Sequence, residues 1–223
     1  MMMSVKELEE DPHFRDLKNL GDRFNLEYQH SVQVCRLALA IYDELQQVHG
    51  LPDRDRTLLM AASFLHDIGA FGPNSRILKD GKVVHGVHEY KHHHKRSQRI
   101  LLDEGAPDLT EAEVRLVSCV ARYHTHSVPK AHHPVYRDLP KRDKRRVRLL
   151  SAILRVADSL DRRHASMARD LRCHLSEDGR MLTIWLFCRK HDFDWRPKHR
   201  TDLFEDEFKV EVKVPVLFGA RVG

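Results

Sequence analysis

A histidine and an aspartate stand side by side at positions 66 and 67, at the end of an apolar helical run, and this pair limits the folds open to the chain. Residues 55–66 carry apolar side chains spaced for one face of a helix, and His66 lies on that face, four positions after Ala62. Asp67 would stand at the carboxyl end of the helix, where the helix dipole disfavours a negative charge. A cation or several hydrogen-bond donors must therefore reach this carboxylate from other parts of the chain.

Other predicted helices offer suitable side chains on their inward faces. The periodicity predicts helices over residues 27–48, 89–104 and 141–168. A cap at Thr110 and Glu113 starts another helix, and a capping box at Ser4 and Glu7 starts a short one. The candidate ligands on these helices are His30, His93, His94, His124 and Asp158. Each histidine taken alone is more often a satisfied core residue, because intermediate burial is ordinary for this residue type. Together they predict a metal site built from facing helices, with nitrogen and oxygen donors that suit manganese, iron or zinc.

The whole chain predicts a mainly α fold, with a helical bundle domain at residues 1–168 and a small α/β unit at residues 169–223. The stretch LRCHLSEDGRMLTIWLFCR predicts two strands around a turn at residues 177–179, with Trp185 in the core. DLFEDEF predicts a short helix, and KVEVKVPVLF alternates like a strand. Residues 69–88 predict a loop or lid, and residues 125–140 a long loop.

Composition excludes several classes of protein. Four cysteines without paired spacing argue against a disulfide framework and a zinc ribbon, and favour a reducing compartment. The first residues lack the apolar segment of a signal peptide, and no apolar run approaches the roughly 18 residues of a membrane span. The sequence therefore predicts a cytoplasmic protein with no membrane partner.

The positive charge is concentrated in one segment. Residues 130–175 hold 13 Lys or Arg against 5 Asp or Glu, within a chain of net charge +5. The common explanation is a solvated helix face, and the alternative is a field that attracts a phosphate ester or polyphosphate. The sequence argues against a nucleic-acid partner, because no nucleic-acid-binding motif accompanies the positive charge. A homodimer is left open.

The order of these residues resembles the HD superfamily of metal-dependent phosphohydrolases. The stretches LHDIG (65–69), HKRS (94–97), ARYHTHSVP (121–129) and LPKRDKRRVRLLSAILRVADSLDRRH (139–164) further resemble the carboxy-terminal HD region of the exopolyphosphatase/guanosine-pentaphosphate phosphatase (Ppx/GppA) family. The small α/β tail is similar to the last domain of that family, so the resemblance runs from about residue 20 onward. The 223 residues contain no counterpart of the family's actin-like domains. Arg96 replaces the second histidine of the family's H-K-H-S motif. The closer match to this family favours His94 as ligand, and His93 is nearly equal, because other HD proteins place the ligand four residues before the small residue.

The resemblance implies one or two divalent ions: manganese, iron, zinc or magnesium. One ion would be held by His30, His66, Asp67 and Asp158, and a second by Asp67, His94 (or His93) and His124. Asp67 would bridge the two ions, and Asp67, His94 and His124 would serve catalysis. A metal-activated water would then attack the phosphorus of a nucleotide, a phosphomonoester or a polyphosphate.

Cations around this site would hold the substrate phosphate, and Lys95 and Arg163 are the preferred candidates. The alternative to an enzyme is a regulatory HD module that binds polyphosphate or an alarmone. The presence of the full ligand set favours the enzyme. Eight further histidines are expected on the surface or in loops: His85 and His88, which could reach substrate from the lid, and His92, His132, His133, His164, His191 and His199.

Overall fold

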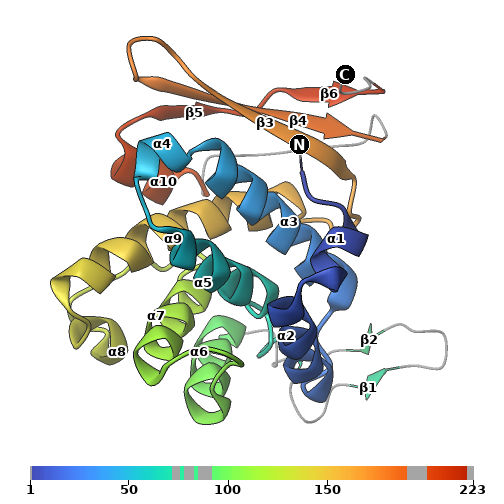
Figure 1. Cartoon of the computed structure of the whole chain (residues 1–223), viewed down its shortest axis with the longest axis vertical. Coiled ribbons are helices and arrows are strands. Elements are labelled where there is room, and N and C mark those ends of the chain that lie inside the picture. The colour runs from blue at the N-terminus through green and yellow to red at the C-terminus, as the bar shows by residue number, and fades with distance from the viewer. Residues whose placement is uncertain (1, 72–75, 78–82, 85–91, 190–199, 220–223) are drawn as a thin grey trace.

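The fold is mainly helical, with a small sheet formed by the carboxy-terminal part of the chain, as the sequence predicted (Figure 1). The computed structural model describes residues 2–71, 76–77, 83–84, 92–189 and 200–219. The helices are α1 (Val5–Glu10), α2 (Pro12–Arg23), α3 (Tyr28–Glu44), α4 (Gln46–His49), α5 (Asp53–Phe64), α6 (His93–Glu104), α7 (Glu111–Arg122), α8 (Pro134–Arg137), α9 (Lys141–Leu160) and α10 (Asp202–Phe208). The strands are β1 (Arg76–Ile77), β2 (Val83–Val84), β3 (Ala168–Leu175), β4 (Met181–Cys188), β5 (Glu211–Lys213) and β6 (Val216–Phe218).

Helix α3 lies at the centre of the bundle, as the burial of almost all of its side chains from residue 30 to residue 42 shows. It contacts α5 and α9, and α7 closes the bundle against both of these helices. The sheet covers another side of α3, mainly through β3 (Figure 1). The four helices α3, α5, α7 and α9 therefore present their inward faces to one another, which is the arrangement that a shared site between helices requires.

The carboxy-terminal sheet is built around β4. Strand β3 pairs with it antiparallel, while β5 and β6 pair with it parallel at Met181–Thr183 and Leu186–Cys188. The predicted single strand at residues 209–218 is thus two short strands, which Val214 and Pro215 separate. Trp185 was predicted in the core but is 38% exposed, because strand side chains alternate and its neighbours Ile184 and Leu186 take the buried face.

The hydrophobic core continues without a break from the helices to the sheet. It includes Ile41 of α3, Val156 of α9, Ile184 of β4 and Phe204 of α10. The division into units at residue 168 stays a prediction. No helix in the described part of the chain combines the length and apolar character that a membrane span requires.

Several predicted element boundaries were wrong. The helix predicted over residues 27–48 ends at Glu44, and Val48 is 41% exposed. The long helix predicted to about residue 168 ends at Leu160. Helix α2 was not predicted, and the predicted loop at 125–140 contains α8. Within the predicted lid, β1 and β2 form an antiparallel pair; His85 and His88 lie outside the described residues.

Candidate metal centre

Six histidine and aspartate side chains from five helical segments come together in the interior of the bundle. They are His30 of α3, His66 and Asp67 directly after α5, His93 of α6, His124 directly after α7, and Asp158 of α9. Two overlapping groups among them have donor atoms within 4.8 Å of one another: His30, His66 and Asp158, and His66, Asp67 and His124. The side chain of His66 belongs to both groups, so they form one continuous cluster.

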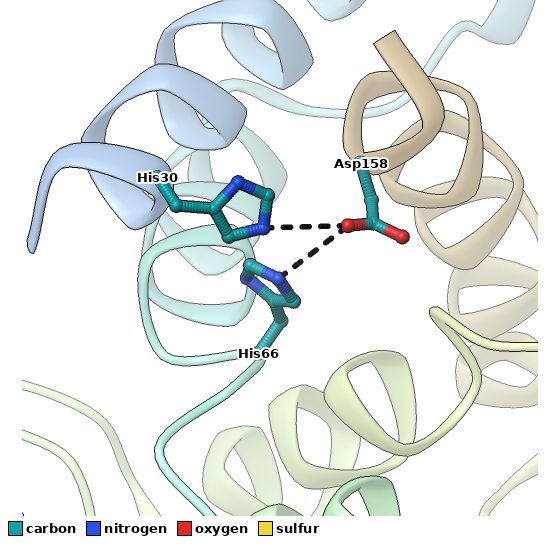
Figure 2. Close-up of side chains that lie close together, drawn as sticks. All are labelled: His30, His66 and Asp158. Atoms are coloured by element: carbon teal, nitrogen blue, oxygen red, sulfur yellow. Dashed lines mark ion pairs between the residues drawn. The ribbon is translucent and has the colours of Figure 1, made fainter. Parts of the chain in front are cut away.

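In the first group, two imidazoles point at one carboxylate oxygen. Oδ1 of Asp158 lies 3.5 Å from Nε2 of His30 and 3.7 Å from Nε2 of His66. Figure 2 shows both rings directed at this oxygen from different helices. These separations leave the three atoms close enough to share one ion, whose bonds to such ligands are about 2.0–2.2 Å long.

In the second group, the two oxygens of Asp67 face different partners. Oδ2 lies 3.6 Å from Nε2 of His66, while Oδ1 lies 3.2 Å from Nε2 of both His93 and His124. The Nε2 atoms of His93 and His124 are 3.0 Å apart. Asp67 therefore stands between the two sets of imidazoles, which is the position that a bridging ligand would take.

The geometry favours His93 over the preferred sequence candidate His94. His93 is buried and contacts Asp67, whereas the ring centroid of His94 is 5.6 Å from that of His93 and its residue is only half-buried. The physical reason is that α6 begins at His93, so neighbouring side chains in its first turn point in different directions.

Three of the imidazoles have their Nδ1 atoms already engaged on the far side of the ring. Nδ1 of His66 lies 2.8 Å from the carbonyl oxygen of Ser63, and Nδ1 of His124 lies 2.6 Å from that of Ala121. Nδ1 of His30 lies 2.9 Å from Oδ2 of Asp161. Since a carbonyl or carboxylate oxygen accepts the Nδ1–H, the lone pair of each neutral ring is at Nε2 and faces the cluster.

Buried polar atoms without hydrogen bonds mark the same place. Within the described residues, Nε2 of His30, Nε2 of His66 and Oδ1 of Asp67 are buried and form none. Native interiors rarely leave such groups unsatisfied, because each costs about 1–3 kcal/mol. These three atoms are all potential metal-binding atoms, so the residues present fit a divalent ion.

The electrostatics keep both carboxylates charged. Burial raises the pKa of Asp67, but the nearby His66, His124 and His93 outweigh it and hold that pKa well below its usual value. Asp158 behaves in the same way, with burial outweighed mainly by His30 and His66. The cluster thus offers two anionic ligands at neutral pH.

The two imidazoles that face Asp158 differ in their protonation. Burial lowers the pKa of His66 to about 4, so this ring is neutral at physiological pH. Burial also lowers the pKa of His30, but its contacts with Asp158 and Asp161 raise it to about 10. A metal ion at Nε2 of His30 would therefore take the place of a proton that these carboxylates otherwise hold there.

Gly69 lets the turn that carries His66 and Asp67 lie directly on the start of α6. Its amide donates to Oγ of Ser97 at 3.0 Å, and its carbonyl accepts from Nε of Arg96 at 2.8 Å. A Cβ atom at this position would lie 2.4 Å from the backbone nitrogen of Ser97, so only glycine fits. Arg96 thus holds this turn against α6.

The carboxy-terminal segment also reaches the cluster. Nη1 of Arg200 donates to Oδ2 of Asp158 at 2.9 Å and to the carbonyl oxygen of His124 at 2.7 Å. Arg155, which is completely buried, donates to Oδ1 of Asp202 at 2.6 Å and to the carbonyl oxygen of Thr125. These contacts fix the position of Asp158 and of the chain after α7.

Sequence reasoning missed three residues that support the ligands. Asp161 and Arg200 hold His30 and Asp158, as described above. His164 was expected on the surface or in a loop, and it lies in the turn after α9. There its ring stacks on that of His30 with centroids 3.7 Å apart, and its Nδ1 lies 2.9 Å from Oε2 of Glu27. Asp161 could have been found from its spacing of three residues from Asp158, which places both on one side of a helix.

The two proposed phosphate-binding cations lie at the edge of this region. Lys95 is exposed in the first turn of α6, and Arg163 is exposed in the turn that follows α9. Their contact with substrate stays a prediction.

A comparison with protein families finds that a model described as "HD domain" matches residues 28–163. The match covers more than half of the chain and all six residues of the cluster. A comparison with curated proteins finds no match.

Proposed function

Because the chain belongs to the HD domain family, a superfamily of metal-dependent phosphohydrolases, we propose that it hydrolyses a phosphate ester or anhydride. The observation that carries the proposal is the convergence of oriented imidazole Nε2 atoms on two buried carboxylates, Asp67 and Asp158. Burial of this set of donors is costly, and a cation that joins them would offset that cost.

The ligand atoms divide into two adjacent sites. His30, His66 and Asp158 would hold one ion, with Asp67 as a further ligand, and Asp67, His93 and His124 would hold a second. A divalent ion bound here supplies a Lewis acid for the phosphoryl oxygens and lowers the pKa of a water molecule. The mixture of imidazole and carboxylate favours manganese, iron or zinc over magnesium, which prefers oxygen ligands.

The chain's own residues orient these groups. The acceptors at Ser63, Ala121 and Asp161 keep a proton on Nδ1 of His66, His124 and His30, so Nε2 remains a lone-pair donor. If a single ion occupies the first site, His93 and His124 are left to donate hydrogen bonds to the substrate phosphate. His124 would do so in its doubly protonated form, since burial lowers its pKa but Asp67 outweighs burial and raises it. Lys95 and Arg163 would neutralise the remaining phosphate charge.

The substrate class follows from sequence features outside the cluster. The basic segment between residues 130 and 175 suits a polyanionic substrate, and the similarity to the Ppx/GppA family points to a nucleotide, a phosphomonoester or a polyphosphate. We propose this class for a cytoplasmic enzyme, with manganese as the first ion to supply.

The test combines metal content with hydrolysis. Elemental analysis of the purified protein accompanies assays on an aryl phosphate and a panel of nucleotides with added manganese. Asp67→Asn, which is nearly isosteric, should lose both metal and activity, while the exposed Asp178→Asn should behave as wild type. Bound metal without turnover on any phosphate would instead favour a regulatory binding module. Absence of metal after supply of manganese would overturn the proposal.

A further inference from the structure

A cavity of about 670 Å³ lies between the amino-terminal half of α3 and the start of β3. Its walls come from α1, α3, the residues before β3, β3 itself and the end of β4. None of the six residues of the metal centre lines it. Its volume lies within the range of about 300–1,000 Å³ that is usual for sites of small organic ligands.

Three arginines from different elements line this cavity: Arg36 of α3, Arg169 of β3, and Arg189 directly after β4. Among the described residues, none of these three forms an ion pair with a carboxylate, whereas Arg54, Arg56, Arg146 and Arg148 do. Arg169 and Arg189 are exposed, and Arg36 is half-buried. Asp170 and Glu7 attract Arg36, but burial and Arg189 outweigh them and leave its pKa lowered. Three guanidinium groups at one cavity without an ion-paired carboxylate form a site of positive potential.

The guanidinium of Arg36 is fixed in place before any ligand binds. Nε donates to the carbonyl oxygen of Met3 at 2.6 Å, and Nη1 donates to Oε1 of Gln33 at 2.9 Å. Burial lowers the pKa of Arg36, and the charge of Arg189 lowers it further. The two cations are therefore close enough to repel each other, and an anion between them would relieve this repulsion.

The rest of the lining suits a ligand that has an organic part as well as charge. Gln29 and Ser166 offer an amide and a hydroxyl group, and Tyr28 and Val32 form an apolar wall. Guanidinium groups bind phosphate oxygens in pairs of parallel hydrogen bonds. We propose that this cavity binds a phosphate-bearing small molecule of about nucleotide size, at a site separate from the metal centre.

The cavity is connected to the metal centre through two hydrogen bonds. Ser166 lines the cavity, and its amide donates to Oδ1 of Asp161 at 2.8 Å. The other oxygen of Asp161 lies 2.9 Å from Nδ1 of His30. The site is thus adjacent to the metal centre but does not include its ligands, so the two can be tested independently.

The experiment measures binding to the full chain by calorimetry after metal removal with EDTA. Inorganic phosphate, pyrophosphate, ADP and adenosine serve as probes. We expect ADP to bind and adenosine to fail, and binding of pyrophosphate as tight as ADP would show that the phosphates alone supply the affinity. Failure of all three phosphate compounds, or binding of adenosine as tight as ADP, would overturn the proposal.

Variants then locate the site. Arg169→Gln and Arg189→Gln replace exposed side chains, so the fold should persist, and each should weaken ADP binding about tenfold. Arg180→Gln, on the same sheet and equally exposed, should bind ADP as wild type does. Asp67→Asn should also retain binding, so the result does not depend on the metal centre. Binding that survives both arginine changes, or that disappears in Asp67→Asn, would place the ligand elsewhere and overturn the proposal.

Discussion

Asp161 and Asp158 hold the two nitrogens of one histidine from opposite sides. Oδ2 of Asp161 lies 2.9 Å from Nδ1 of His30, while Oδ1 of Asp158 lies 3.5 Å from its Nε2. The shorter contact belongs to the residue that would not bind the metal. Asp161 therefore sets the orientation of the ring, and Asp158 can act as a ligand beside it.

Removal of the Asp161 carboxylate should weaken metal binding although no proposed ligand is lost. Asp161→Ala frees the His30 ring and should reduce metal affinity about 10–100-fold, the usual effect of removing such a supporting group. Asp161→Asn keeps one acceptor oxygen and should lie between the alanine variant and wild type. Affinity is measured by competition with a chromophoric chelator, with the thermal midpoint as the control for folding. Equal affinities in wild type and Asp161→Ala would contradict this role.

Substitution of the two adjacent histidines at the start of α6 should separate their roles. His93→Ala removes the contact with Asp67 and should lower metal content and phosphatase activity together, because one ligand of the second site is lost. His94→Ala should change metal content little. The paired variants differ by one position, so each is the control for the other. The reverse result would restore the assignment of His94.

Neutralisation of Arg200 should alter the first metal site, although Arg200 is far from Asp158 in the sequence. Arg200→Gln removes a cation that donates to Oδ2 of Asp158, so the carboxylate loses its fixed orientation. We expect weaker metal binding in this variant, with partial recovery in Arg200→Lys, which keeps the charge but has different geometry. Unchanged metal binding in Arg200→Gln would show that the backbone of α9 alone positions Asp158.

The sequence predicted the inward position of four cluster residues because a helix repeats every 3.6 residues. His30, His66 and His124 are indeed buried, and Asp158 is nearly so, although their role as ligands stays a prediction. Periodicity could not choose between His93 and His94, because His92 takes a left-handed conformation with φ 72° and α6 begins only after it. No local pattern could reveal Arg200, which is separated from Asp158 by 42 positions and comes from another part of the fold.

The basic segment at residues 130–175 includes the start of α9, and it was interpreted as a solvated helix face or as a field that attracts a phosphate compound. One arginine at the start of α9 has a different role. Nε of Arg146 donates to the two oxygens of Asp55 at 2.9 and 3.1 Å, and Asp55 is completely buried. Such a pair depends on the approach of two helices far apart in sequence. Sequence alone therefore could not distinguish Arg146 from its exposed neighbour Arg145.

Loss of Arg146 should destabilise the fold strongly, because it leaves the Asp55 carboxylate buried without a partner. Arg146→Met is expected to lower the free energy of unfolding by about 3–5 kcal/mol. Arg145→Met, one position away and exposed, should cost little. The double variant Asp55→Leu/Arg146→Met removes both charges and should recover part of the loss. Chemical denaturation measures all three, and an Arg146→Met variant as stable as wild type would contradict the prediction.

The cap of α7 should make stability depend on pH. Glu113 accepts from Nε of Arg54 at 2.7 Å and from the backbone of Thr110 at 2.9 Å, and these contacts, Arg54 first, lower its pKa from 4.5 to about 2. A pKa lowered by folding stabilises the native state above the unfolded value of 4.5, and this contribution is lost as pH falls toward 2.

Glu113→Gln should therefore be less stable than wild type at pH 7, with the difference shrinking between pH 5 and pH 3. Glu111→Gln, in the same first turn and exposed, is the matched control. Thr110→Ala should cost about 1 kcal/mol through loss of the cap. Denaturant unfolding across this pH range measures each variant, and a constant difference between wild type and Glu113→Gln would disprove the linkage.

The contact of Arg200 with Asp158 has an evolutionary consequence. The match to the HD domain ends at residue 163, yet a side chain beyond that boundary holds one of the residues proposed to bind metal. Selection on the proposed metal centre should therefore act on the carboxy-terminal segment as well. Among relatives that retain this unit, positions 158 and 200 should change together, and relatives that have exchanged it for another should carry a substitute donor for the same carboxylate oxygen.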